Sequence, residues 1–185
     1  IKVFDLVSAY SAFANQGVHA SPVYVTRIED ESGNIIYEAV SETTDIFNKE
    51  IAYTMISLLK GVTEAGSGVR LRHNWMIDNP VYKEVVTGYP YEFKNPIAGK
   101  TGTTQNQSDG WFMGMVPNLA TGVWVGAEDR SVHFDNITYG QGATMALPVW
   151  ANYMRKSYND SIGISSEDFI KPDQIQINLL CNEAN

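Results

Sequence analysis

Several kinds of residue are scarce in this chain, and each scarcity excludes a class of protein. The one cysteine, Cys181, rules out a disulfide within the chain and a cysteine-based zinc site. The chain has 13 basic and 21 acidic residues, a formal net charge of −8, and no basic run. This balance argues against a nucleic-acid partner and against a polybasic membrane patch. No stretch approaches the roughly 20 apolar residues that a membrane span needs.

Two further absences concern metal ligands and the start of the chain. The three histidines, His19, His73 and His133, lie far apart in the sequence, so surface or core roles fit them better than metal ligation. We therefore expect no metal site formed by these histidines, and the sequence implies neither a metal nor an organic cofactor. The chain starts at Ile1 without an initiator methionine and without a signal peptide. We expect it to be a fragment of a longer protein.

Helical and strand patterns alternate in the first part of the chain. Apolar residues at helical spacing predict a helix over 4–16, ended by Gly17 in a left-handed cap. Two short strands are expected on either side of the turn Ser32-Gly33-Asn34. Asn48 is then suited to cap a second helix. The apolar stripe predicted for this second helix consists of Ile51, Met55, Leu58 and Val62.

The second part of the chain predicts a sheet followed by a helix. Strands are expected over 97–104, 110–116 and 121–127, and their short links favour antiparallel pairing. A helix is expected over 145–158, capped by Thr144. The fold class is therefore α+β, an antiparallel sheet flanked by helices. The length favours one domain, and we expect residues 159–185 to form a partly extended tail. Before the sheet, five aromatic residues suggest a loop that packs against the core: Trp75, Tyr82, Tyr89, Tyr91 and Phe93.

The most informative motif is Lys100-Thr101-Gly102-Thr103-Thr104, within the run Asn95-Pro96-Ile97-Ala98-Gly99-Lys100 and its continuation. A lone Lys-Thr-Gly is a weak signal. Here it is followed by Asp109-Gly110-Trp111-Phe112-Met113-Gly114. The whole run resembles the third active-site motif of penicillin-binding proteins, in particular the transpeptidase domain of the bifunctional class A type.

Other segments carry the same resemblance in the expected order. Residues 8–17 are similar to the family helix that follows the second active-site motif. Residues 62–70 resemble the segment before the third motif, and residues 122–126 resemble a strand after it. Residues 140–150 are similar to the start of the family's C-terminal helix. The resemblance thus covers about residues 5–154. It implies that residues 1–158 are the C-terminal part of a transpeptidase domain.

The motif residues suit acyl transfer involving a peptide with a free carboxylate. Lys100 supplies a positive charge near the reacting centre, and the hydroxyls of Thr101 and Thr103 can hold a substrate carboxylate. Gly102 lacks a Cβ, so an acyl chain can lie against the strand. The resemblance implies that Lys100 and Thr103 are catalytic, with the Thr103 backbone N–H donating to the oxyanion. Thr101, Gly102, Thr103 and Thr104 are the expected substrate-binding residues.

The family's nucleophile cannot be found in this chain. The family uses Ser-x-x-Lys, then Ser-x-Asn, then Lys-Thr-Gly, in that order. The one match to the first pattern is Ser57-Leu58-Leu59-Lys60, which a helical wheel places opposite the predicted apolar stripe and therefore on a solvated face. The matches to the second pattern, residues 32–34 and 157–159, are out of order and read as a hairpin turn and a helix end. We expect the chain by itself to be inactive.

The resemblance implies a bacterial cell-wall enzyme. In the family a serine attacks the acyl-D-Ala-D-Ala peptide of peptidoglycan, or a β-lactam that mimics it. The expected partners are therefore peptidoglycan stem peptides and β-lactams, and no nucleic acid. A class A member usually carries a glycosyltransferase domain upstream. It is anchored in the cytoplasmic membrane, and this part faces the periplasm or the cell exterior.

Two alternative functions stay open. A serine β-lactamase-like hydrolase shares the sheet and the Lys-Thr-Gly element. A non-catalytic binding module could keep the strand without the serine. Trp111-Phe112, the helix after Gly142 and the insertion over 75–93 favour the transpeptidase.

The sheet of this chain is expected to be incomplete. By resemblance, the family's five-stranded sheet contains two strands that precede the nucleophile and pair beside the strand over 121–127. Without them that strand is an apolar edge, rich in Val123, Trp124 and Val125. We therefore expect the isolated chain to be oligomeric, domain-swapped or paired with the missing half of its domain.

Overall fold

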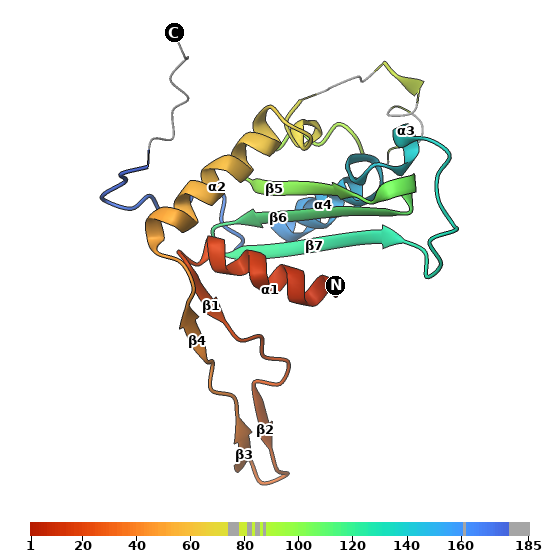
Figure 1. Ribbon diagram of the computed structural model, residues 1–185. Helices are drawn as coiled ribbons and strands as arrows, with labels where there is room; N and C mark the ends of the chain where they lie inside the picture. Colours follow the sequence, from red (N-terminus) through yellow and green to blue (C-terminus); the bar gives the residue numbers. More distant parts are fainter. Residues whose placement is uncertain (74–77, 81–82, 84–85, 87, 161, 178–185) are drawn as a thin grey trace.

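A computed structural model describes the chain except for residues 74–77, 81–82, 84–85, 87, 161 and 178–185. A three-stranded antiparallel sheet lies between two helical layers (Figure 1). Helices α1 (Val3–Ala14) and α2 (Lys49–Glu64) cover one face, and α4 (Gly142–Asn159) covers the other. This arrangement confirms the predicted α+β class.

The sheet has the order β5-β6-β7, with β5 at Ala98–Thr103, β6 at Asp109–Val116 and β7 at Leu119–Gly126. All three predicted strands are confirmed, within two residues at each end. Lys100 pairs with Met113 and Gly102 pairs with Trp111 across the β5–β6 ladder. Short connections hold these neighbours together, as the antiparallel prediction required.

The core against α4 is built around Trp150, which is fully buried. Its ring lies 5.1 Å from that of Phe112, and its Nε1 donates to Thr121 Oγ1 at 2.5 Å. The helix itself begins at Gly142, three residues before the predicted start. Its N-cap residue is Gln141, so the prediction that Thr144 caps it was wrong. Sequence propensity could not place this start, because it is fixed by packing on the sheet.

The N-terminal helix follows its predicted course. The prediction of 4–16 matches α1 closely, and Gln16 and Gly17 take left-handed backbone conformations with φ of 56° and 95° just after it. The predicted cap of α2 is confirmed, since Asn48 Oδ1 accepts from the Ile51 N–H at 2.8 Å. Both helices pack on the sheet, α1 chiefly on β7 and α2 on β5.

The predicted apolar stripe of α2 was wrong. Ile51 and Leu58 are 44% and 64% exposed, whereas Ile56 and Leu59 are buried. Apolar residues occur as adjacent pairs along this helix, so two overlapping stripes compete for the core. The stripe that includes Ala52 is buried, because a small residue lets the helix lie close to its neighbours.

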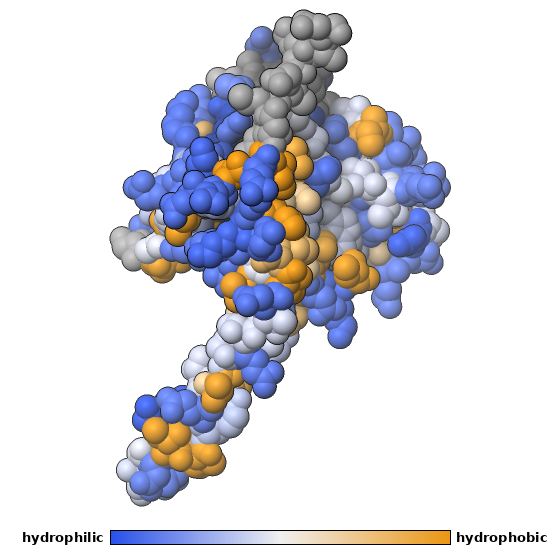
Figure 2. All heavy atoms as spheres, turned by 60° about the vertical axis from the view of Figure 1, so that its left-hand side comes forward, coloured by the Kyte–Doolittle hydropathy of each residue, from blue (hydrophilic) through white to orange (hydrophobic). Residues whose placement is uncertain are grey.

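An arm formed by residues 18–45 projects from the body (Figure 1). At its base β1 (Val18–Ala20) pairs with β4 (Thr43–Asp45). Farther out β2 (Arg27–Glu29) pairs with β3 (Ile35–Glu38), which confirms the predicted hairpin. Apolar side chains gather near its far end (Figure 2). Along the whole arm, the exposed apolar residues include Val23, Val25, Ile28, Ile36, Tyr37 and Val40. Tyr24 stacks on Phe4 of α1, with 5.0 Å between ring centroids.

The loop before β5 and the C-terminal tail both pack against the body. The expected packed loop holds for its described aromatics: Tyr91 is buried, and burial raises its pKa. Trp75 and Tyr82 lie outside the described residues. The tail folds back on the α2 face, where Phe169 is buried. Short helical turns occur at Val69–Leu71, Gln105–Gln107 and, as α3, Ile137–Gly140. Within the described residues, no helix combines the length and apolar character needed to cross a membrane.

Candidate active site

The Lys-Thr-Gly motif lies on an edge strand. Within the described part of the chain, β5 pairs with β6 and with no other strand, so no strand covers its outer edge. Such an edge can align an extended peptide. The side chain of Lys100 is exposed, and its Nζ donates to the carbonyl oxygen of Thr101 at 2.8 Å. A cation therefore stands beside a strand edge that is open to a peptide.

The pleat of β5 divides the motif between the two faces of the sheet. Ala98 packs with Ile56 and Leu59 of α2, so Lys100 and Gly102 lie on the α2 face. Thr101 and Thr103 alternate with them and therefore lie on the opposite face of the sheet. A Cβ on Gly102 would come within 3.0 Å of Trp111 Cβ, so the cross-strand neighbour as well as a ligand favours glycine there.

The hydroxyl of Thr103 is oriented by the start of α4. The Gly142 N–H donates to Thr103 Oγ1 at 3.0 Å. With that lone pair occupied, the hydroxyl can direct its own proton toward a ligand carboxylate. The positive end of the helix dipole favours an anion at the same place.

Only a glycine fits at position 142, because the helix start lies directly on the sheet. A Cβ there would come within 2.2 Å of Gly102 O and 2.5 Å of Trp111 O. Both are backbone atoms, which cannot move aside as a side chain can. Sequence reasoning placed Gly142 near a helix start but gave no sign of its hydrogen bond to Thr103. That contact joins segments 39 residues apart in the chain.

Thr101 has a partner that the sequence did not indicate. Its Oγ1 lies 2.6 Å from the Oγ of Ser67, just beyond the end of α2. The two hydroxyls sit beside the strand as a pair that can exchange donor and acceptor roles. The arrangement leaves both Thr101 and Thr103 with a hydroxyl fixed by a neighbour.

Thr104 differs from the other motif residues. Its hydroxyl donates to Asp109 Oδ2 at 3.1 Å, accepts from the Asp109 N–H at 2.9 Å and lies 3.0 Å from Ser108 Oγ. With these partners inside the protein, any contact of Thr104 with a substrate would come from its backbone or its methyl group. The structure thus brings the five motif residues together and gives Thr104 a place in the loop that follows β5.

The alternative Ser-x-x-Lys match has no place at this site. Ser57 Oγ donates to the Tyr53 carbonyl of its own helix at 2.9 Å. Lys60 Nζ makes an ion pair with Asp168 at 2.8 Å. Neither side chain contacts the other in a hydrogen bond among those described. These partners argue against Ser57 and Lys60 as a nucleophile and its base. The predicted apolar stripe of α2, from which the sequence argument against them started, was wrong.

The Ser-x-Asn matches are also structural. Residues 32–34 form the hairpin turn, where Asp30 Oδ1 accepts from the N–H of Ser32 and of Asn34. Residues 157–159 end α4.

Over the described ranges, no group of three His, Cys, Asp or Glu side chains could hold a metal ion.

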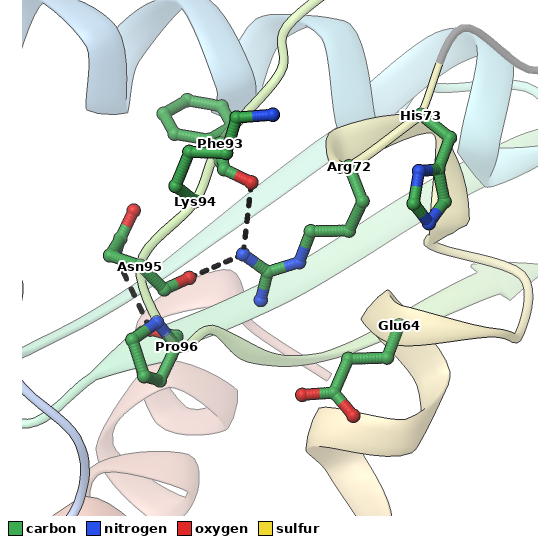
Figure 3. A pocket seen from close by; sticks show the side chains of 7 residues that line it. All are labelled: Glu64, Arg72, His73, Phe93, Lys94, Asn95 and Pro96. Carbon is green, nitrogen blue, oxygen red and sulfur yellow. Dashed lines mark hydrogen bonds between the residues drawn. The ribbon is translucent and has the colours of Figure 1, made fainter.

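A pocket of about 300 Å³ at the other end of β5 has a structural explanation (Figure 3). Arg72 Nη1 donates to the carbonyls of Phe93, at 3.3 Å, and Asn95. Its Nη2 donates to Thr63 Oγ1 at 3.2 Å. Burial lowers the pKa of Arg72, and the nearby Glu64 carboxylate opposes that shift. Arg72 thus ties the segment before β5 to α2.

Comparison with known proteins gives a consistent result. Residues 2–129 match the family model described as the penicillin binding protein transpeptidase domain. Penicillin-binding protein 1A of Aquifex aeolicus is 30% identical over 179 residues, which cover 95% of this chain and 21% of that protein. Penicillin-binding protein 2D of Bacillus subtilis is 27% identical and covers 93% of this chain and 22% of its own length. The chain thus spans about a fifth of the length of these curated relatives.

Solved structures agree on the fold. Penicillin-binding protein 1A from Haemophilus influenzae superposes with a TM-score of 0.71 at 19% identity, over 93% of this chain and 28% of that one. PonA1 from Mycobacterium tuberculosis gives 0.70 at 23% identity, over 94% of this chain and 42% of that one. A further PonA1 structure, with a TM-score of 0.69 at 23% identity over 94% of this chain and 42% of that one, holds penicillin V. At these identities the likeness concerns the fold alone.

Proposed function

The chain belongs to the transpeptidase family of class A penicillin-binding proteins, and from this membership we propose that it is part of a peptidoglycan D,D-transpeptidase. The whole protein binds penicillin and cross-links cell-wall peptides through a serine acyl-enzyme. The observation that carries the proposal is the open edge of β5, where Lys100 is exposed and the Thr103 hydroxyl is fixed by the Gly142 N–H.

Each motif residue has a role in this proposal. The substrate lies along the outer edge of β5, with its carboxylate at the hydroxyls of Thr101 and Thr103. The Lys100 ammonium favours binding of that anion and holds positive charge near the reacting carbonyl. The Thr103 backbone N–H donates to the oxyanion as the carbonyl becomes tetrahedral. A donor held by a strand and a helix start needs little reorganisation during the reaction.

The attacking serine comes from outside these 185 residues. Acyl transfer needs a hydroxyl whose proton is taken by an adjacent base, and the one Ser-x-x-Lys match has both members engaged elsewhere. The chain by itself therefore binds ligands weakly and forms no acyl-enzyme. A β-lactamase-like hydrolase would release the acyl group rapidly to water. A non-catalytic module would never form it.

The setting of the whole protein follows from the same proposal. A glycosyltransferase domain and a membrane anchor belong to the rest of the protein, and this part faces the periplasm or the cell exterior of a bacterium. Residues 1–158 form the C-terminal part of the transpeptidase domain. Residues 159–185 form a tail whose Phe169 side chain packs on the α2 face.

The outer edge of β7 also belongs to this proposal. Among the described strands, β7 pairs with β6 and no other. Trp124 is 39% exposed on it, and exposed apolar edges attract further strands. We propose that the rest of the domain covers this edge, and that the isolated chain covers it with a second copy or an exchanged element.

Labelling with a fluorescent penicillin tests the proposed function. The whole protein should be labelled covalently and stably, and Lys100→Ala should slow the labelling. A label that is lost within seconds would favour the hydrolase. The absence of any label on the folded whole protein would favour the binding module and contradict the proposal.

A further inference from the structure

A buried carboxylate lies directly behind the candidate site. Asp109, the first residue of β6, is 7% exposed, and each of its carboxylate oxygens has a partner. Oδ1 accepts from Trp124 Nε1 at 3.1 Å, and Oδ2 accepts from the Thr104 hydroxyl at 3.1 Å. One side chain thus connects the end of β5 to the end of β7.

Backbone hydrogen bonds close the same loop a second time. The Thr104 N–H donates to the Asp109 carbonyl at 3.1 Å, and the Asp109 N–H donates to Thr104 Oγ1 at 2.9 Å. Between them, Asn106 and Gln107 have φ of 60° and 52°, in the left-handed region that non-glycine residues rarely adopt. Such a loop persists only when its surroundings fix it, and the contacts between Thr104 and Asp109 do so.

The charge of Asp109 determines the direction of these bonds. A carboxylate has no proton to donate, so the Thr104 hydroxyl must donate to it and can accept from the Asp109 N–H. An asparagine would bring an NH₂ group to one of two places where a donor already points: the indole N–H or the threonine hydroxyl. The arrangement therefore requires an acceptor at both oxygens.

We propose that Asp109 is a positioning residue for the acylation reaction, acting through Thr104 on the adjacent Thr103. This inference rests on the proposed function of the site. Thr103 is held on one side by the Gly142 N–H and on the other by the loop that Thr104 and Asp109 close. Its backbone N–H, the oxyanion donor, then keeps its direction while the acyl group is transferred. Loss of Asp109 should impair the chemical step more than initial binding.

Four variants of the whole protein test the inference. Asp109→Asn removes one acceptor, and Thr104→Val removes the hydroxyl at almost constant shape. Thr104→Ser restores the hydroxyl. Thr63→Val is the matched control, because the Thr63 hydroxyl is buried and donates to Ile97 O at 2.7 Å near the other end of β5. The readouts are the rate constant of acylation by a fluorescent penicillin at saturation, the dissociation constant of the non-covalent complex, and the unfolding temperature.

Asp109→Asn and Thr104→Val should lower the acylation rate constant by about tenfold or more, with the dissociation constant changed by less than about threefold. Thr104→Ser should restore most of the rate. Thr63→Val should lower the unfolding temperature but leave acylation unchanged. The inference would be overturned by wild-type acylation rates in Asp109→Asn and Thr104→Val, or by an equal loss of acylation rate in Thr63→Val. Either result would leave the proposed function intact. A folded wild-type protein that penicillin does not acylate would overturn the proposed function, and the inference with it.

Discussion

Replacing Gly142 by alanine should disturb the site through a single added methyl group. A Cβ at this position would come within 2.2 Å of Gly102 O, whereas ordinary contact begins at 3.4 Å. The start of α4 must therefore move by about 1 Å from the sheet, because the opposing atoms are backbone. The Gly142 N–H would move with it and lose its 3.0 Å hydrogen bond to Thr103 Oγ1.

Two contributions set the size of the effect. Forcing a methyl group into a packed contact costs about 1–3 kcal/mol, and a lost hydrogen bond adds about 1 kcal/mol. The free energy of unfolding should therefore fall by about 2–4 kcal/mol, which lowers the unfolding temperature of the domain by roughly 5–15 °C. A displacement of about 1 Å at Thr103 should also slow penicillin acylation, by up to about a hundredfold.

Gly61→Ala is the matched control for this change. Gly61 is exposed on α2, and a Cβ there would meet no atom within 4 Å. Because alanine favours a helix, the same chemical change should stabilise the protein by about 0.5–1 kcal/mol and leave acylation unaltered. Thermal unfolding and acylation kinetics of the whole protein measure both effects. If Gly142→Ala left stability and acylation unchanged, the packing of α4 against the motif would be refuted.

Three further predictions concern the lysines, the α2 face and the sheet edge. Lys100→Ala should slow acylation of the whole protein by roughly a hundredfold in stopped-flow labelling. Lys60→Ala, which removes the ion pair to Asp168, should leave the rate nearly unchanged. Equal losses in the two variants would contradict the assignment of the site. In denaturant unfolding, Ile56→Ala should destabilise the domain by about 2–5 kcal/mol and Leu58→Ala by less than about 1 kcal/mol. The reverse order would show that the stripe predicted from the sequence, which contains Leu58, is the buried one. The isolated chain should associate through β7 in light scattering at micromolar concentration, and a stable, cooperatively melting monomer with protected β7 amides would exclude this.

The parts of the fold that follow from local chemistry could be predicted from the sequence. Asn48 caps α2 as expected, because its side chain needs only the next helical turn as a partner. The β5–β7 sheet also follows from short links between strands of high propensity. The motif residues come together because they are contiguous on one strand.

Contacts between distant segments could not be predicted in the same way. The buried face of α2 depends on how closely Ala52 and its neighbours approach the sheet, and periodicity alone favoured the adjacent stripe. The start of α4 at Gly142 is determined by the backbone atoms of Gly102 and Trp111 below it. No pattern within a single helix contains that information.

In the candidate site too, the local features could be predicted from the sequence and the contacts between distant segments could not. Lys100 and Thr103 were identified from the motif and its resemblance to a family. The bond from Asp109 to Trp124 links two strands, and it became visible only once β6 and β7 had been placed in register. Thr104 stays a predicted substrate-binding residue, and the sequence did not indicate that its hydroxyl has partners in the loop after β5.

The most direct test of the central claim is mass spectrometry of the whole protein and of the 185-residue chain after incubation with penicillin. We predict one stable penicillin adduct on the whole protein, at a serine outside these residues, and none on the chain alone. An adduct on Ser57, or on any other serine within the chain, would contradict the account. So would a folded whole protein that carries no adduct.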